Sequence, residues 1–354
     1  EPLAEDRLTW FSETRAGIKR WRPANWLGQR RDVDQSRLFP RLDAREEINL
    51  PLRLGPVRVV PYAVVRGTYW DDSPPDGEKC RPYGQIGARA NVHIWRVYNE
   101  AESRLWDIHR LKHVITPEVA VFGSDVAEVS PDDLFPIQSG VEEELRRQSG
   151  AVFTLRQRLV TQRGLPGRRR DADWMRMELS AGAFRHREDI PADGRFFSYR
   201  PEYSIGRSFV NGSYLWNIST ATTLLSDANY DTHTGQIGRA SVGLNVNRTP
   251  RLAYFGGLRY IRDLDASVGT LGLTYQLTRK YAVTFLEQYD LDYRGGENAI
   301  TRLVIVRKFP RWFVGLTVEF DQNGEGDDVG FYLALWPQGA PEVKLGSGDR
   351  GYFA

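Results

Sequence analysis

Apolar and polar residues alternate one by one along most of this chain. Between Thr270 and Leu277 one face carries leucine and tyrosine, while the other carries threonine, glycine and glutamine. The same alternation runs from Trp312 to Phe320, from Ala240 to Asn247 and from Ile86 to Ile94. A period of two residues is typical of β-strands that have one apolar and one polar face. The pattern therefore predicts an all-β protein.

The alternating segments have 8 to 12 residues each, close to the roughly 9–11 residues with which a tilted strand crosses a membrane. Turn-forming stretches such as Asp72–Gly77 separate them. The connections 278–280 and 308–311 are short, whereas 163–173 and 321–328 are long, as in barrels with short periplasmic turns and long outer loops. We expect about sixteen strands, centred near residues 50, 63, 90, 116, 143, 156, 179, 202, 219, 241, 256, 272, 285, 304, 316 and 332.

So many strands without a helical pattern exceed what one soluble sandwich uses, and closing a sheet removes its unpaired edges. The prediction is a transmembrane antiparallel β-barrel of the outer-membrane type, with apolar side chains facing lipid and polar side chains facing an aqueous lumen. The expected location is the outer membrane of a Gram-negative-type bacterium. A soluble sandwich or solenoid that buries the same apolar rows is the alternative.

The alternation divides the chain into three parts. Residues 1–42 carry tryptophan and arginine without clean alternation, and we expect loops and short strands that lead into the barrel. Residues 43–340 are the expected barrel portion, and residues 341–354 are a C-terminal tail. The chain starts at Glu1 without a signal peptide, so we expect either a removed signal or a piece of a longer protein.

Composition narrows the class further. Charged residues make up 27% of the chain and the mean hydropathy is −0.49, which a barrel tolerates because only one face of each strand is apolar. No run approaches the roughly 18 apolar residues of a spanning helix. The net charge of +2 is too small to indicate nucleic acid. Cys80 is the only cysteine, which excludes an internal disulfide and a cysteine-based metal site.

Few residue patterns indicate chemistry. His109 and His113 are four residues apart, but the glutamate of an H-E-x-x-H site is absent and a strand pattern follows, so we interpret them as histidines near a strand end. Alternation divides Glu142, Glu143 and Glu144 between two faces, and we expect them to be solvated. Phosphate loops, nucleophile elbows and paired-cysteine motifs are absent from the sequence. We therefore expect no enzyme, no catalytic residue, no metal and no cofactor.

Arginines mark the polar faces of the expected strands. Guanidinium groups bind phosphates through paired hydrogen bonds, which would suit a polyanionic glycolipid. The alternative is an ordinary lumen lining in which arginine is balanced by glutamate and aspartate. The lumen-lining candidates are Arg89, Arg156, Arg158, Arg176 and Arg239. A basic loop follows the strand 151–162 and comprises Arg163, Arg168, Arg169 and Arg170.

Several stretches, in order, resemble the outer-membrane lipopolysaccharide-assembly proteins, the LptD or organic solvent tolerance (OstA) family. Leu111–Val119 resembles that family's strand in which a basic residue or histidine, here His113, precedes an apolar pair and a proline, here Pro117. The resemblance covers roughly residues 40–340. The family's barrel has about twenty-six strands, preceded by a periplasmic lipid-binding domain, so the chain resembles a C-terminal barrel portion. The further similar stretches are Arg45–Tyr69, Tyr83–Tyr98, Asp133–Phe135 and Leu271–Trp336.

The resemblance implies assembly and insertion of lipopolysaccharide into the outer leaflet, through the barrel lumen and a lateral seam. The implied partners are lipopolysaccharide, a plug lipoprotein in the lumen, a periplasmic bridge component and outer-membrane lipids. The implied seam joins the first and last strands, and the last strand is expected at 329–336.

Two other functions stay open. One is a general porin-like diffusion channel, which long inward loops and conductance without a partner lipoprotein would favour. The other is a soluble β-rich binding protein, which partition into the aqueous phase without detergent would favour.

Overall fold

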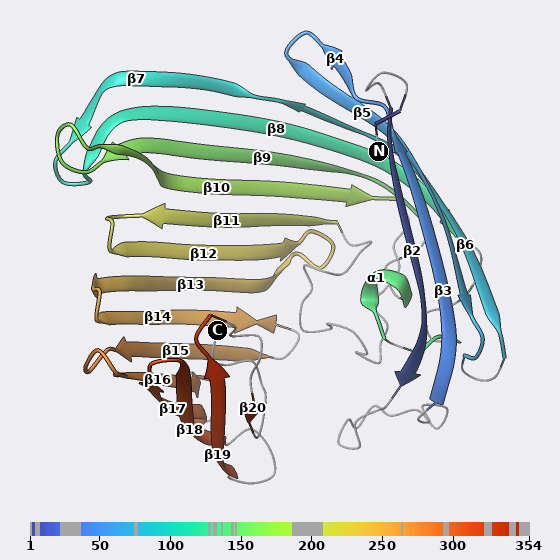
Figure 1. Ribbon diagram of the computed structural model, residues 1–354. Helices are drawn as coiled ribbons and strands as arrows, with labels where there is room; N and C mark the ends of the chain where they lie inside the picture. The colour runs from blue at the N-terminus through green and yellow to red at the C-terminus, as the bar shows by residue number, and fades with distance from the viewer. Residues whose placement is uncertain are drawn as a thin grey trace.

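The computed structural model of this chain shows an all-β protein. It describes residues 2–3, 8–21, 37–73, 77–126, 129, 133–135, 137–142, 145, 147–185, 208–262, 265–292, 297–321, 328–339 and 345–346. The described strands belong to one antiparallel sheet (Figure 1), and a short helix, α1 (Ser139–Glu142), lies beside it. The strands are β1 (Pro2–Leu3), β2 (Leu8–Trp21), β3 (Arg37–Asn49), β4 (Leu52–Leu54), β5 (Val57–Trp70), β6 (Lys79–Val92), β7 (Ile94–Ser103), β8 (Ile108–Val126), β9 (Gln148–Arg163), β10 (Arg170–Phe184), β11 (Phe209–Asn217), β12 (Thr222–Asp231), β13 (Gln236–Thr249), β14 (Leu252–Ile261), β15 (Ala266–Tyr275), β16 (Tyr281–Asp290), β17 (Glu297–Lys308), β18 (Trp312–Asp321), β19 (Asp328–Pro337) and β20 (Leu345–Gly346).

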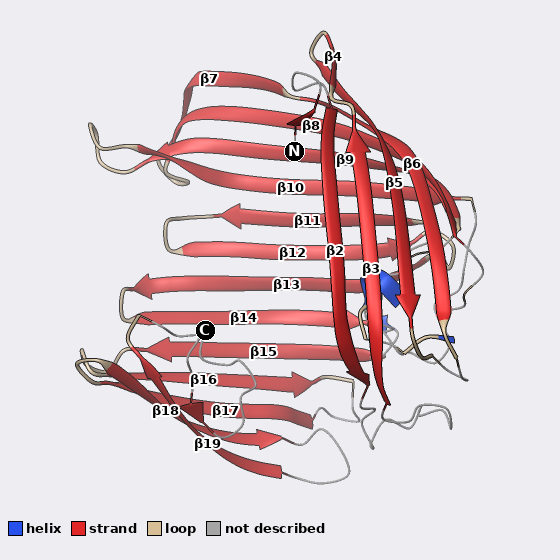
Figure 2. Cartoon of the chain, turned by 45° about the vertical axis from the view of Figure 1, so that its right-hand side comes forward, coloured by secondary structure: helices blue, strands red, loops and turns tan. Residues whose placement is uncertain are grey.

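Strands that are neighbours in the sequence are neighbours in the sheet, from β2 to β19. β6 and β7 follow each other along the same edge of β8, and β4 is a short arm beside β5. The wall therefore has sixteen strand positions, formed by β2, β3, β5, the β6–β7 pair and β8 through β19. Within the described residues this number agrees with the prediction of about sixteen strands, but the individual strands differ: the expected centre near residue 50 falls between β3 and β4, and β2 was not expected. The sheet curves strongly, so that β2 and β3 lie across from β16 through β19 (Figure 2).

The two faces of this sheet have opposite chemistry. On β18, Leu316 and Phe320 point outward and are exposed, whereas Thr317 and Glu319 point inward and are buried. Leu271 on β15 is 62% exposed on the same outer face. In the part of the chain that the structure describes, no second sheet or helical layer covers these outer apolar rows. An exposed apolar band with a polar interior is the signature of a sheet whose outer face meets lipid.

The architecture is that of an outer-membrane-type antiparallel β-barrel, and the predicted fold class is confirmed. A soluble sandwich would pack the apolar rows of one sheet against those of another, and the described residues form one sheet only. Within the described residues, we find no helix with the length and apolar character that crossing a membrane requires.

A seam separates the first and last long strands of the sheet. β2 pairs along its length with β3, and its other edge pairs with β1 only at Leu8 and Thr9. The outer edge of β19 pairs with β20 only at Ala334 and Leu335. Among the described residues, β2 pairs only with β1 and β3, and β19 pairs only with β18 and β20.

The expected irregular lead-in over residues 1–42 was wrong for Leu8–Trp21. These residues form the 14-residue strand β2, which pairs with β3 from Thr9 to Trp21. The middle of β2 is polar on both faces, with Ser12 and Glu13 side by side. These polar residues interrupt the alternating pattern, and the interruption hides the strand in the sequence.

The connections differ in length between the two ends of the sheet, as the sequence predicts. At one end the hairpins turn within short stretches such as 250–251, 276–280 and 309–311, and we call this the short-turn end. At the other end, 21 residues of sequence separate β8 from β9 and 24 separate β10 from β11. The prediction of a long loop at 163–173 was wrong, because β9 and β10 extend into it and leave only a turn at the short-turn end.

Candidate functional site: the inner face and the segment docked on it

Part of the connection between β8 and β9 lies on the inner side of the sheet, against β3, β5 and β6. Leu134, Phe135 and Val141 are buried there against Phe39 and Trp70. The rings of Phe39 and Phe135 stack with their centroids 5.0 Å apart. Burying an apolar side chain of this size contributes about 1.5–3 kcal/mol. These contacts anchor the described part of the connection on the inner side of the sheet, and we call residues 133–135 and 137–142 the docked segment.

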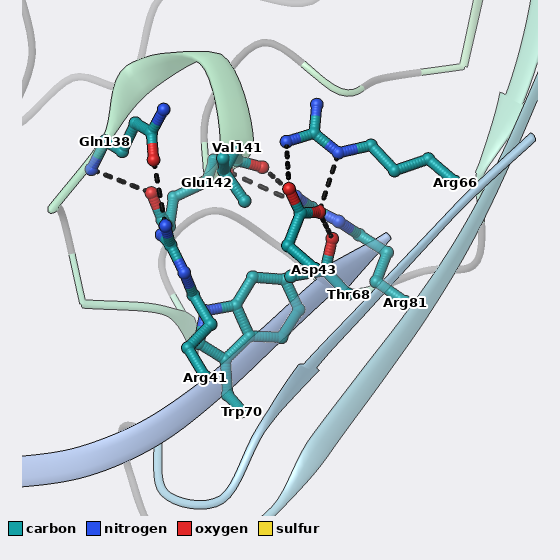
Figure 3. A network of polar contacts seen from close by, with 9 residues as sticks. All are labelled: Arg41, Asp43, Arg66, Thr68, Trp70, Arg81, Gln138, Val141 and Glu142. Atoms are coloured by element: carbon teal, nitrogen blue, oxygen red, sulfur yellow. Dashed lines mark hydrogen bonds and ion pairs between the residues drawn. The ribbon is translucent and has the colours of Figure 1, made fainter. Parts of the chain in front are cut away.

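A buried ion pair fixes the helical end of the docked segment (Figure 3). Arg41 on β3 donates from Nη1 to Oε1 of Glu142 over 2.6 Å and from Nη2 to Oε1 of Gln138 over 2.8 Å. The backbone N–H of Gln138 donates to the second carboxylate oxygen of Glu142 over 2.8 Å. Glu142 is only 1% exposed. Burial raises the pKa of the Glu142 carboxyl, and the Arg41 guanidinium opposes this shift.

The expectation that Glu142 is solvated was wrong. It lies in α1 and not on an alternating strand, and its carboxylate faces Arg41, the Gln138 N–H and the indole N–H of Trp70 at 3.4 Å. Glu143 and Glu144 lie outside the described residues.

Arg81 on β6 contacts the C-terminal end of α1. Its guanidinium donates to the backbone carbonyl of Val141 and, over 3.4 Å, to that of Glu142. The same guanidinium lies over the Trp70 ring at 5.1 Å. The last carbonyls of a helix have no partner within the helix, so Arg81 supplies the donors that burial of this end requires.

A second ion pair orders the inner wall beside this network. Arg66 on β5 donates to both carboxylate oxygens of Asp43 on β3, over 2.7 and 2.8 Å. The hydroxyl of Thr68 donates to the same carboxylate over 2.8 Å. Paired donors of this kind fix a carboxylate in one orientation, which keeps the inner faces of β3 and β5 in register beneath the docked segment.

The structure brings three predicted lumen-lining arginines together. Arg156 on β9 bridges Glu118 on β8, at 2.9 Å, and Glu178 on β10, at 2.8 Å. Arg158 and Arg176 both pair with Asp173. These three arginines, with Glu178, line a hollow of about 500 Å³.

The remaining two candidates lie on other strands of the inner face. Arg239 pairs with Asp227 at 2.6 Å. Arg89 stacks over the Tyr62 ring at 4.3 Å, and its guanidinium is 3.8 Å from Glu47. The inward orientation predicted for all five arginines is thus found, and each has an acidic neighbour. This arrangement matches the alternative of a charge-balanced lumen lining.

The expected basic loop is not one site. Arg163 is buried, and its Nη2 donates to the backbone carbonyls of Asn217 over 2.7 Å and Ile218 over 3.3 Å. It also approaches the carbonyl of Trp106 at 3.4 Å, so it clamps two neighbouring short turns together. Arg168, Arg169 and Arg170 are exposed at the turn between β9 and β10.

The structural role of Arg163 gives a prediction. Arg163→Met is expected to lower the free energy of unfolding by about 1.5–3 kcal/mol, because several buried carbonyls lose a charged donor. Arg168→Met removes the same charge from an exposed position and should change it by less than about 0.5 kcal/mol. Urea unfolding of the folded protein in detergent measures both, and equal values for the two variants would contradict the clamp.

The family-like residues His113 and Pro117 lie on the outer face of β8. His113 Nε2 is 3.2 Å from the side-chain oxygen of Gln157. The register on either side places Pro117 opposite Val92, at the point where β6 ends before His93. Proline has no N–H to donate to the ladder, which accounts for the break between β6 and β7. His109 lies apart from His113, with Asp107 at 3.3 Å.

Sequence reasoning missed the residues that hold the docked segment. A signal was present, because Phe39, Arg41 and Asp43 alternate with Leu38 and Leu42. Assigning residues up to 42 to a lead-in divided this strand and hid its polar face.

No family model and no curated protein matches this chain. Among solved structures, a Rhodopseudomonas blastica porin triple mutant aligns at 11% identity and a TM-score of 0.34, covering 93% of this chain and 99% of that chain. The FrpB iron transporter from Neisseria meningitidis aligns at 12% identity and a TM-score of 0.42, covering 94% of this chain and 62% of that chain. At these TM-scores the likenesses carry no functional argument. The sheet and its inner face define the class of the protein as an outer-membrane-type β-barrel with an internally docked segment.

Proposed function

We propose that this chain forms a water-filled, porin-like channel across a bacterial outer membrane, and that the docked segment narrows it. The observation that carries the proposal is the Arg41–Glu142 pair, because it holds a connecting segment on the inner side of the sheet. A segment that folds inward reduces the cross-section open to solutes.

The chemistry of the inner face supports passage of hydrated polar solutes. Arg156 and Arg158 remain about half exposed although each has a carboxylate partner. Exposed pairs of this kind stay solvated and contribute little to stability. Because both signs of charge line the wall, we expect weak selection between anions and cations of similar size.

Planar-bilayer recording tests the proposal. The purified chain alone is expected to give stepwise, ohmic conductance in a lipid bilayer, and heat-unfolded protein is the control. Insertion without conductance steps would rule out a passive channel.

The seam between β2 and β19 favours a second candidate, the assembly of lipopolysaccharide into the outer leaflet. A glycolipid could keep its head group in the lumen while its acyl chains leave sideways where strands are not paired. The resemblance to the lipopolysaccharide-assembly family points the same way. That role would add a plug lipoprotein and a periplasmic bridge as partners.

Crosslinking separates the two candidates. A photoreactive residue at Phe331, exposed on β19 beside the seam, is expected to capture lipopolysaccharide in cells if the chain assembles it. The same probe at Leu271, far from the seam on the outer face, controls for contact with bulk lipid. Equal capture at both positions would remove the support for assembly.

A further inference from the structure

Three successive hairpin turns form one continuous strip at the short-turn end. They connect β13 to β14, β15 to β16 and β17 to β18, and the first two lie at the left of Figure 1. Backbone hydrogen bonds join each turn to the next. Gln276 donates to the carbonyl of Arg251 over 2.8 Å, and Lys308 donates to that of Lys280 over 2.7 Å.

This strip carries a concentrated positive charge. Its turns contain no aspartate or glutamate, and none of the basic residues forms an ion pair with a described residue. The chain as a whole has a net charge of only +2, so the strip is far more basic than the average. We call five of its exposed basic residues the basic rim: Arg251, Arg279, Lys280, Arg307 and Arg311.

At the opposite ends of these strands and of β12, acidic residues outnumber basic ones. The described residues there include Arg262 and a larger number of carboxylates, namely Asp231, Asp265, Asp290, Asp292 and Asp321. The barrel wall over β12 to β18 is therefore polarised along the strand direction.

Aromatic and apolar side chains border the basic rim on its lipid side. Tyr281, Phe309 and Trp312 are exposed at the same turns. The Arg307 guanidinium lies over the Phe309 ring at 4.5 Å and near the Tyr281 ring at 5.4 Å. Aromatic girdles mark the level at which a barrel passes from acyl chains to head groups, so the rim lies at head-group height.

We propose that the basic rim binds the phosphate groups of anionic phospholipids in the membrane leaflet at the short-turn end. Charge complementarity carries this choice, since each basic residue near an anionic leaflet attracts it. The basic rim is continuous with the lipid-facing band, because the same turns carry both the basic residues and the aromatic border. This continuity favours a lipid over an acidic protein as the ligand of the rim. The inference rests on the membrane-spanning fold and not on which solute the lumen passes.

Spin-labelled lipids test the rim directly. The full chain is reconstituted in phosphatidylcholine vesicles with a trace of spin-labelled phosphatidylglycerol or phosphatidylcholine, and the fraction of motionally restricted label gives the relative affinity. Wild-type protein should prefer phosphatidylglycerol about fivefold or more, and salt near ~1 M should remove most of this preference. The variant R279Q/K280Q/R307Q/R311Q should lose it, whereas R279K/R307K/R311K should keep it.

A matched control tests whether the lipid preference comes from the basic rim and not from other basic residues at the same end. R168Q/R169Q/R170Q removes three exposed arginines from another turn at the same end, which has no aromatic residue and is followed by Asp171. This control is expected to retain most of the preference. Equal loss in this control, or no preference in the wild type, would overturn the proposal. A preference insensitive to salt would do the same. Channel conductance is measured separately, so failure of the rim and failure of the channel are distinguishable.

Discussion

Arg41→Ala is expected to release the docked segment and to lower the free energy of unfolding by about 3–5 kcal/mol. The reason is that the docked position would bury the Glu142 carboxylate without its cation, and release of the segment removes that cost. In the docked position the carboxylate would retain only the Gln138 N–H at 2.8 Å and the distant Trp70 indole. Urea unfolding of the folded chain in detergent measures the loss.

Arg45→Ala is the matched control for this prediction. Arg45 lies on the same inner face of β3 and pairs with Glu47, but its side chain is 30% exposed. Glu47 is buried, but it keeps Arg89 as a second cation at 3.8 Å, so the loss of the half-exposed Arg45 is expected to cost only about 1 kcal/mol. The double variant R41M/E142L should recover much of the lost stability, because replacing both partners of a buried pair by apolar groups is often neutral or favourable. If Arg41→Ala costs no more than Arg45→Ala, the pair does not anchor the segment.

The same change should alter conduction. Because the docked segment narrows the proposed channel, Arg41→Ala should raise single-channel conductance, whereas Arg45→Ala should leave it near the wild-type value. If Arg41→Ala lowers stability as expected but leaves the conductance unchanged, the pair anchors the segment, and the claim that the segment narrows the channel is wrong.

Leu271→Arg is expected to destabilise the barrel by about 2–4 kcal/mol in a lipid bilayer, since it places a charge on the lipid face near the middle of a strand. Leu271 lies in the centre of β15, and its outer-face neighbours are Gly256 and Glu287. Both arginine variants are therefore made in a Glu287→Gln background, because Glu287 would otherwise pair with the new arginine at position 271. Thr270→Arg introduces the same side chain one residue away on the inner face and should cost much less. Unfolding in vesicles measures both variants. A larger cost for Thr270→Arg would mean that the apolar rows do not face lipid.

Most of the wall could be predicted because its strands are half buried. Each strand from β13 to β18 has one face toward lipid and one toward the lumen, so its period of two is visible in the sequence. The prediction of a strand centred at residue 219 was wrong, because residues 218–221 form the turn between β11 and β12. This turn contains neither glycine nor proline. There the hydroxyl of Ser219 accepts hydrogen bonds from the N–H groups of Ala221 and Thr222, and a serine turn of this kind is a weak signal. The expected strand centre at 202 lies outside the described residues.

The docked segment could not be predicted from local pattern. We expected a strand centred near 143, but the segment is held by contacts such as Arg41 with Glu142, whose partners are 101 residues apart. No periodicity encodes such a pairing. The orientation of the lumen arginines was predictable, and their partners were not. A bulge between Asp173 and Met175 shifts the register of β10 and places Asp173 on the inner face with Arg158 and Arg176.

Cysteine scanning along β15 tests the central claim most directly. In a Cys80→Ser background, single cysteines from Val268 to Thr274 are labelled in vesicles with an environment-sensitive probe. We expect positions 269, 271 and 273 to be quenched by lipids that carry a quencher in their acyl chains. Positions 268, 270, 272 and 274 should be quenched only by a water-soluble agent. Quenching of both sets by the water-soluble agent, or protection of the Leu271 set from both, would show that the apolar face of this sheet does not meet lipid.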